Sequence, residues 1–545
     1  MLRTRMLAVA AALASAIPAV AAVQLVGPTD GALETGSAVT VTIAAADDAE
    51  AAAATLSLNG RDVTARLRGS GPTRTVVLAG MPGPQSPLRF GANHLLVRAA
   101  DRVAVGTFTW KPKLARVRVV AVGNAIDFAA YATSATWQAE VDRIFTTLVA
   151  PRLVAGRPNV VVLTEDFGLP TALIGSRGAA ARAAKDQDAL TALTNLFVTY
   201  FTQASFYSTG YALPGTGLQP LARALTLALT DTLYRNFVPV LQAKAQQYGV
   251  WLVACTNVAP AHRSTDAGDV ALFGDVDDPA RTDVWLPDGI DVYNTAFLWA
   301  PDGSLLGTTR KVFLTPPEED LLNLSHGALD DVQVFDTPAG RLGVAISLDA
   351  FIDTYVHRLD DLGAVLVLQP DANPGLWASR PASVWQPDDW TGSVLGMLRP
   401  EFPNVTYNAT SMMVGNFFPG VIGADGNPTG ILFDGQSSIT RRGPRPVRHG
   451  FVAMSPSLGL TGRFVALAPW AFPDPATVKG LGALTALRTR CGSAAGAGLP
   501  PGRLTLEQRR DILRDCAKSM LPGGANADGY RENVAVADVT VPVAR

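Results

Sequence analysis

The stretch TPAGRLGVAISLDAF, residues 337–351, gives the clearest indication of the fold. Its centre, Leu342–Ile346, is an apolar run that predicts a strand buried on both faces, and the run ends at Ser347. Asp349 follows two residues later. Because α/β proteins commonly place polar functional groups at the ends of buried strands, we expect a functional site at Ser347.

Two segments upstream carry polar residues in the same kind of position. In NVVVLTEDFGLP, residues 159–170, the apolar run Asn159–Leu163 predicts a buried strand, and Glu165 follows it. In VYNTAFLWAPDGSLLGTTRKVFLTPPEED, residues 292–320, two strands joined by an Asp302-Gly303 turn lead to Lys311. The three segments together predict a carboxylate, an ammonium and a hydroxyl at neighbouring strand ends.

The rest of this part of the chain alternates strands with helices. Arg116–Ala121 predicts a buried strand, and Trp137 to Val149 has apolar residues at helical spacing, so an α/β layered domain is expected. Residues 171–230 add helical material that is aromatic-rich or strongly apolar, as in Leu218–Leu229. That material is interpreted as an insertion packed on the domain, with a lid or a lipid-facing surface as the alternative.

The three segments resemble the carbon–nitrogen hydrolase (nitrilase/amidase) superfamily. The chain has VVLTE, then Asn294-Thr295, Asp302-Gly303 and Arg310-Lys311, then GVAISLD, in the order in which that family carries its Glu, Lys and Cys motifs. Downstream, LGAVLVLQPDANP, GILFDGQSSI and ENVAVADVTVP are similar to its later strands. The resemblance implies a four-layer α-β-β-α sandwich over residues 114–545, with insertions near 171–230 and 445–525.

The resemblance also implies roles for individual residues in acting on a small amide-type compound with a non-peptide C–N bond. Glu165 would be the general base and later the acid, while Lys311 and the Leu348 backbone N–H would stabilise an oxyanion. Glu319 would be the second glutamate that orients the substrate or the lysine, with Glu318 as its competitor in the same loop. No cofactor is implied.

Ser347 departs from the family, which has its nucleophilic cysteine there. A serine hydroxyl is far less acidic than a thiol and needs a well-oriented base; Glu165 alone is a poor match, and His357 is expected to face away. Three interpretations stay open: a serine nucleophile, a non-catalytic relative (pseudoenzyme) that binds its ligand in the old pocket, or an engineered cysteine replacement. A further alternative is an acyl-chain-handling member similar to apolipoprotein acyltransferases. A purely structural alternative for Glu165 and Lys311 is a buried ion pair that holds strands together.

The N-terminal quarter predicts two more units. Residues 1–22 have a charged start, an apolar stretch and a small-residue cleavage site, which is typical of a secretory signal peptide, so an extracytoplasmic (periplasmic or secreted) location is expected. Residues 23–112 have short alternating runs and frequent turns, which predict a small antiparallel β-sandwich. Its stretches LSLNGRDVTARL and GANHLLVRAADR loosely resemble bacterial immunoglobulin-like modules.

Bulk composition limits the remaining possibilities. Hydrophobic residues make up 48% of the 545 and charged residues 17%, which suits a large packed core, and the net charge of −2 gives no footprint for binding nucleic acid. The histidines are scattered singly, so no metal site is expected, and no apolar run reaches membrane-spanning length. Cys491 and Cys516 could pair, and Cys255 is expected to be a buried thiol. Small-molecule binding and possible homo-oligomer formation complete the expectations.

Overall fold

The computed structural model describes residues 23–83, 86–100, 102–184, 189–373, 392–417, 431–435, 437–446, 448–449, 452–453, 460–468 and 532–544. The signal-peptide candidate, Cys491 and Cys516 lie outside these residues, as does most of the expected insertion at 445–525. None of the described helices is both long and apolar enough to cross a bilayer.

Residues 24–110 form a small all-β unit of two sheets packed face to face. The strands are β1 (Gln24–Gly27), β3 (Val39–Ala44) and β6 (Thr73–Leu78) in one sheet, and β2 (Ala32–Glu34), β8 (Arg102–Trp110), β7 (Gly91–Ala99), β4 (Thr55–Leu58) and β5 (Arg61–Asp62) in the other, with the short helix α2 (Asp48–Ala53). Alternate residues of β3 and β7, such as Val41 and Val97, are fully buried between the sheets. This period of two gives the sandwich predicted from the alternating runs.

The larger unit is built on two six-stranded sheets. The first has the order β15 (Leu305–Arg310), β14 (Tyr293–Trp299), β11 (Trp251–Val258), β10 (Asn159–Val162), β9 (Lys113–Gly123) and β26 (Asn533–Val543). The second has the order β16 (Val334–Thr337), β17 (Gly340–Val344), β18 (Leu366–Asp371), β19 (Tyr407–Met412), β22 (Ser438–Pro446) and β25 (Thr461–Leu467). Short pairs complete the strands: β12 (Ala261–Ser264) with β13 (Val284–Pro287), β20 (Val414–Phe417) with β21 (Ile431–Asp434), and β23 (Arg448–His449) with β24 (Val452–Ala453).

The two sheets pack on each other, and helices cover their outer faces. Val160 and Val162 of β10 face Leu368 and its neighbours of the second sheet, whereas Val161 faces the opposite way, toward the helices. That outer face is covered by α3 (Ser134–Ile144) and α8 (Thr230–Tyr248). On the far side of the second sheet lies α10 (Asp353–Asp361), whose Tyr355 hydroxyl donates to the Val344 carbonyl at 2.8 Å. The predicted four-layer α-β-β-α sandwich is confirmed.

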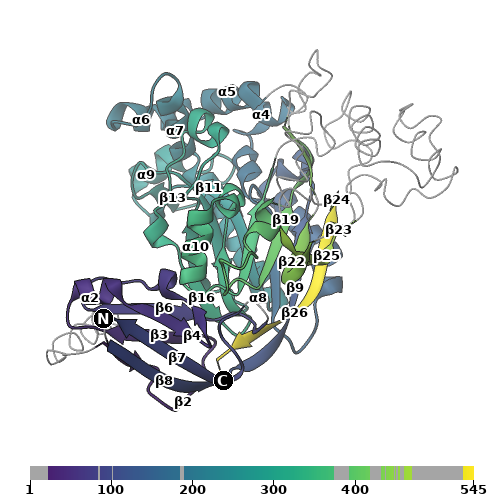
Figure 1. The fold of residues 1–545 in the computed structure, drawn as a ribbon. Coiled ribbons are helices and arrows are strands. Elements are labelled where there is room, and N and C mark those ends of the chain that lie inside the picture. The colour runs from purple at the N-terminus through teal and green to yellow at the C-terminus, as the bar shows by residue number, and fades with distance from the viewer. Residues whose placement is uncertain are drawn as a thin grey trace, which may run out of the picture.

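The expected insertion forms a separate group of helices at the end of this unit farthest from the β-sandwich (Figure 1). They are α4 (Ala179–Ala183), α5 (Ala189–Thr199), α6 (Phe201–Gly210) and α7 (Gln219–Ala228). The short helix α9 (Ala267–Phe273) lies outside the expected range, and its Phe273 packs against Phe206 of α6. Arg223, in the middle of the apolar stretch of α7, is buried and donates to the Ser325 hydroxyl at 2.7 Å. A buried charge is tolerated there because its guanidinium has polar partners.

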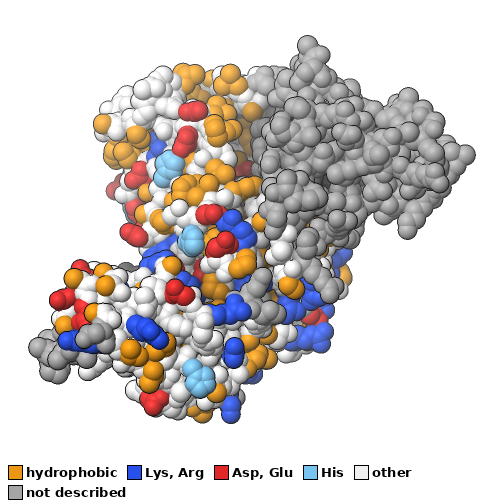
Figure 2. Space-filling view, in the orientation of Figure 1, with side chains coloured by type: hydrophobic (Ala, Val, Ile, Leu, Met, Phe, Trp, Pro, Cys, Tyr) orange, Lys and Arg blue, Asp and Glu red, His pale blue; other side chains and the backbone are white. Residues whose placement is uncertain are grey.

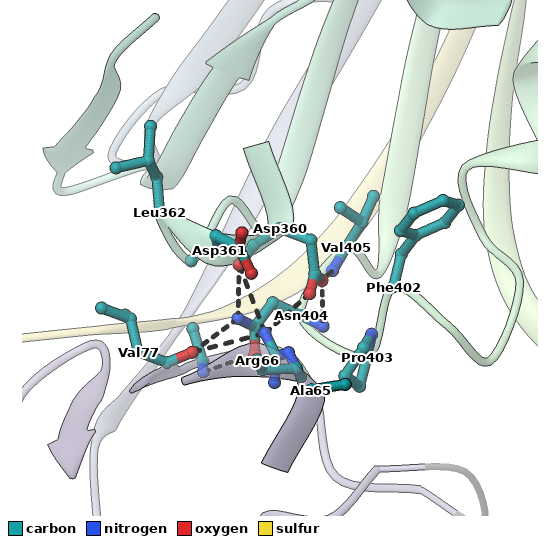
Figure 3. Close-up of polar contacts among 12 residues, drawn as sticks. Ala65, Arg66, Val77, Asp360, Asp361, Leu362, Phe402, Pro403, Asn404 and Val405 are labelled. Carbon is teal, nitrogen blue, oxygen red and sulfur yellow. Dashed lines mark hydrogen bonds and ion pairs between the residues drawn. The ribbon is translucent and has the colours of Figure 1, made fainter. Parts of the chain in front are cut away.

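The β-sandwich is docked to the second sheet by polar contacts rather than by an apolar interface alone (Figure 3). The Arg66 guanidinium binds the Asp360 carboxylate at 2.6 Å, and their side chains are 11% and 2% exposed. Asp360 also accepts from the backbone N–H of Asn404 at 2.7 Å, and the Asn404 side chain donates to the Val77 carbonyl at 2.9 Å. This cluster ties the sandwich to α10 and to the approach to β19.

Candidate functional site

Glu165, Lys311 and Ser347 line the same cavity, as expected from their positions after buried strands. Glu165 lies three residues beyond β10, Lys311 directly follows β15, and Ser347 opens the single-turn helix η8 (Ser347–Phe351) just after β17. Each residue thus follows the end of a strand, β10 and β17 in the buried interior and β15 at the edge of its sheet, which fixes its backbone before any substrate binds.

Lys311 is the centre of a buried ion cluster. Its Nζ donates to Glu165 Oε1 and to Glu318 Oε2, both at 2.7 Å, and its side chain is only 1% exposed. Asn294 of β14 repeats the bridge, since its side-chain NH₂ donates to Glu165 Oε1 and Glu318 Oε1 at 2.9 Å each. The two carboxylates are therefore held side by side by one ammonium and one amide.

Glu318, and not Glu319, contacts Lys311 in the cavity. The structure therefore places the competitor of Glu319, rather than Glu319 itself, beside the lysine. Glu319 is 45% exposed and binds His326 at 2.8 Å, outside the cavity lining. The turn η6 (Pro317–Leu321) directs Glu318 inward, where the backbone N–H and hydroxyl of Thr315 donate to its Oε2 at 2.8 and 2.9 Å.

Asp349 has a positioning role near the lysine. It is fully buried, and its carboxylate accepts from the backbone N–H groups of Val312 and Phe313, the two residues after Lys311. The turn that carries Ser347 is thereby fastened to the loop that carries Lys311.

Ser347 sits on a strained turn between strand and helix. Its φ is +43°, a left-handed backbone that a residue with a Cβ rarely adopts. Its Oγ donates to Asp371 Oδ1 at 3.0 Å, and the Gln369 side chain donates to Asp371 Oδ2 at 3.1 Å. A sharp turn that exposes a hydroxyl to a pocket while an acidic group accepts its proton is the arrangement of an activated nucleophile.

Asp371 was not predicted as a site residue, yet it links the two halves of the site. It ends β18, which pairs in parallel with β17, so its side chain reaches Ser347. The next residue, Ala372, donates its backbone N–H to Glu165 Oε2 at 3.1 Å. One strand end therefore touches both the serine and the glutamate.

Burial and charge shift the proton affinities of these groups. Burial raises the pKa of Asp371 to about 7, helped by the negative charge of Glu165 and opposed by the bonds from Ser347 and Gln369. Burial also raises the pKa of Glu165, and Lys311 opposes that effect only in part. The pKa of Lys311 is raised as well, because Glu165 and Glu318 outweigh the effect of burial.

Acidic groups outnumber cations around the cluster. Asp166 lines the cavity beside Glu165, and its pKa is raised well above the usual range by burial and by the neighbouring charges of Glu165 and Glu318. Lys311 is the cation of this cluster in the described part of the chain. Such an imbalance favours protons stored on carboxyl groups, which is the condition for acid–base chemistry near neutral pH.

Leu348 lies at the site, whereas His357 and Cys255 lie away from it. Leu348 lines the cavity next to Ser347. His357 lies on α10 with an exposed side chain, edge-on to Phe402 at 4.7 Å, and outside the cavity. Cys255 is a free thiol buried between the sheets, and burial raises its pKa well above the usual range. Neither His357 nor Cys255 can assist Ser347.

Part of this chain is similar to known proteins. Residues 177–396 match the family model described as carbon-nitrogen hydrolase. The chain is 34% identical over 86 residues to nitrilase 2 and 33% identical over 89 residues to nitrilase 3, both of Arabidopsis thaliana. Each match covers 16% of this chain and 25% of the relative, so the chain spans about a quarter of the length of these relatives.

A carbon-nitrogen hydrolase from Helicobacter pylori G27 gives a TM-score of 0.33 at 14% identity, covering 65% of this chain and 85% of that one. A cysteine-to-serine mutant of an amidase of the nitrilase superfamily from Nesterenkonia AN1 gives 0.32 at 15% identity, covering 60% and 84%. The family match takes in Lys311, Glu318 and Ser347, so the part of the chain that carries these residues is similar to the carbon–nitrogen hydrolase family.

Proposed function

We propose that the chain is an amide-hydrolysing enzyme in which Ser347 is the nucleophile and Asp371 its base. The observation that carries this proposal is the 3.0 Å hydrogen bond from Ser347 Oγ to Asp371 Oδ1 at a turn with φ of +43°. A carboxyl group with a pKa of about 7 is as basic as a histidine, so it supplies what a serine needs and an ordinary carboxylate does not.

The reaction proceeds in two halves. Asp371 takes the Ser347 hydroxyl proton as Oγ attacks the amide carbonyl carbon, and the carbonyl electron pair moves onto oxygen. The Lys311 ammonium and the Leu348 backbone N–H stabilise that oxyanion. When the intermediate collapses, the C–N bond breaks, the amine leaves with the proton from Asp371, and Ser347 keeps the acyl group as an ester.

Glu165 is assigned to the second half. Among the described residues, its Oε1 accepts two bonds, from Lys311 and Asn294, whereas its Oε2 accepts one, from Ala372. Oε2 therefore keeps a free lone pair, which can take a proton from the water that attacks the acyl ester. When this second tetrahedral intermediate collapses, the bond from the acyl carbon to Ser347 Oγ breaks, Oγ takes the proton back from Glu165, and the acid is released. Glu318 and Asn294 hold the side chains of Lys311 and Glu165 in place during both halves of the reaction.

A second candidate is a binding protein without turnover. It is favoured by the serine at a position where the family resemblance implies cysteine. In that case the buried Glu165–Lys311–Glu318 cluster would bind the amide or acid group of a ligand, and Ser347 would be dispensable.

We also propose an extracytoplasmic location, supported by the three-part sequence of residues 1–22. Fractionation of cells that express the full chain, followed by N-terminal sequencing of the product, tests this. Recovery of uncleaved chain in the cytoplasm would contradict it.

The function is tested by ammonia release from simple aliphatic amides with the full chain and its Ser347→Ala variant. The proposal requires turnover that is lost in the variant while the melting temperature stays within a few degrees. Thermal stabilisation by the same amides that is equal in both proteins, with no ammonia from either, would instead establish the binding protein.

A further inference from the structure

The ion cluster lines a large cavity whose remaining lining is mainly apolar. The cavity has a volume of about 1410 Å³. Away from the cluster its lining is contributed mainly by the inserted helices, from Leu190, Leu193, Leu196 and Phe197 of α5 and from Leu221 and Leu225 of α7. The insertion thus extends the site by an apolar chamber.

The chamber is far larger than a small amide needs. At about 30 Å³ per non-hydrogen atom, the volume that a water molecule takes in the liquid, 1410 Å³ holds roughly 45 such atoms. An amide of four or five heavy atoms would leave most of the leucine-lined space without an apolar partner. Apolar space of this size is a binding site for apolar groups rather than for water.

Polar side chains are a minority of the cavity lining, and they include Thr194, Thr226 and Asp320 beside the charged groups. Glu165, Asp166, Lys311 and Glu318 gather where Ser347 lies. Asp353 and Arg399 also line it, but they neutralise each other in an ion pair. Between these groups the walls offer an acyl chain many contacts and few hydrogen-bond partners.

The outer end of the chamber reaches the protein surface through exposed leucines. Leu190, Leu218, Leu221 and Leu321 all line the cavity, yet they are 59%, 71%, 36% and 42% exposed. Hydrophobic side chains gather over α6 and α7 in the same region (Figure 2). An apolar rim that continues into an apolar chamber gives a long chain an uninterrupted path to Ser347.

We infer that the substrate is an amide with a long unbranched acyl chain, whose chain lies in the α5–α7 chamber with its carbonyl at Ser347. This inference rests on the proposed function for its chemistry and on the chamber for its substrate class. It gives the insertion a role in specificity, beyond packing on the domain.

The test is a chain-length series of acetamide, hexanamide and decanamide, all below the concentration at which they aggregate. Each methylene buried in the chamber contributes up to about a fourfold increase in kcat/KM, so decanamide is expected to exceed acetamide by at least about 100-fold. Thr226→Trp, on the cavity face of α7, narrows the chamber and is expected to lower the decanamide-to-acetamide ratio at least about tenfold. Thr202→Trp, on the exposed side of α6, is the matched control and should leave the ratio unchanged.

Binding separates this inference from the proposed function. Calorimetric titration of the Ser347→Ala variant with decanamide and acetamide measures chain recognition without turnover, and Ala222→Phe serves as a second blocking variant if Thr226→Trp does not fold. Stronger binding of decanamide, weakened by either blocking variant, would uphold the inference even if the wild-type chain hydrolysed nothing. Equal binding and equal turnover of the short and long amides would overturn the inference and leave the hydrolase intact.

Discussion

Ser347 and Asp371 lie at the ends of adjacent parallel strands, and Ser347 Oγ donates to Asp371 Oδ1 at 3.0 Å. Parallel pairing of β17 with β18 brings their carboxyl ends to the same edge, so this contact follows from the sheet itself. Through Ala372 the same strand end also holds Glu165. The serine, its acceptor and the lysine-bound glutamate therefore form one connected unit.

The first prediction concerns pH. Asp371 accepts a proton only when ionised, and its pKa is raised to about 7, so kcat/KM should fall as the pH drops below about 7. Asp371→Asn should lower kcat/KM by about 10²- to 10⁴-fold and remove this acidic limb. The measurement is kcat/KM as a function of pH for the wild-type chain and the Asp371→Asn variant. If the fall in kcat/KM below about pH 7 were unchanged in the variant, the titrating group would not be Asp371.

The second prediction concerns the family's own nucleophile. Ser347→Cys introduces a thiol with an ordinary pKa of about 8.5, which the surrounding carboxylates can deprotonate far more easily than a hydroxyl. The variant should hydrolyse amides and should be inactivated by iodoacetamide with one alkyl group added at position 347. Wild-type chain, whose Cys255 is buried, is the control and should not be inactivated.

The third prediction separates two adjacent glutamates. Glu318→Gln weakens the bonds to the buried Lys311 ammonium and should cost about 1–3 kcal/mol of unfolding free energy as well as activity. Glu319→Gln, at an exposed site, should change the unfolding free energy by less than about 0.5 kcal/mol. Urea denaturation of both variants at pH 7 provides the comparison.

The pH dependence of the unfolding free energy also distinguishes Glu318 from Glu319. Lys311 and the bonds from Asn294 and Thr315 lower the pKa of Glu318 despite its burial. A carboxyl with a lowered folded-state pKa stabilises the fold above its unfolded pKa of about 4.3, and that contribution is lost as the pH falls through the folded value. Glu318→Gln should therefore flatten the acid limb of the stability curve, and a limb as steep as in Glu319→Gln would contradict the assignment.

The fourth prediction concerns the docking of the β-sandwich. Arg66→Ala would leave Asp360 buried with backbone donors alone and should cost about 3 kcal/mol or more, with separate unfolding transitions for the two units. Arg68→Ala removes a neighbouring ion pair to Asp361 whose arginine is 49% exposed, and should cost less than about 1 kcal/mol. Differential scanning calorimetry distinguishes them; a single unshifted transition in Arg66→Ala would contradict a docking role.

Much of the fold could be predicted because its strands carry strong local signals. Asn159–Leu163 and Leu342–Ile346 are apolar on both faces, which indicates strands between layers, and the residues that follow them lie at one site. The choice between Glu318 and Glu319 could not be made this way. They lie in a turn without periodicity, and only the inward direction of η6 decides between them.

Asp371 and the chamber were missed for different reasons. LGAVLVLQPDANP is similar to a later strand of the family, and the acidic residue at the end of that strand is a signal that could have found Asp371. The leucines of α5 and α7 have the spacing of ordinary packing, and no local pattern tells a helix face that meets a core from one that lines a cavity.

The most direct test of the central claim is the mass of the protein during turnover of an activated acyl substrate, p-nitrophenyl decanoate, stopped by acid within seconds. We predict a single added decanoyl group that maps to the peptide containing Ser347, is absent in Ser347→Ala, and persists longer in Glu165→Gln, where the attacking water lacks its base. Turnover of amides by the wild-type chain with no adduct under any of these conditions, or with undiminished rate in Ser347→Ala, would show that Ser347 is not the nucleophile.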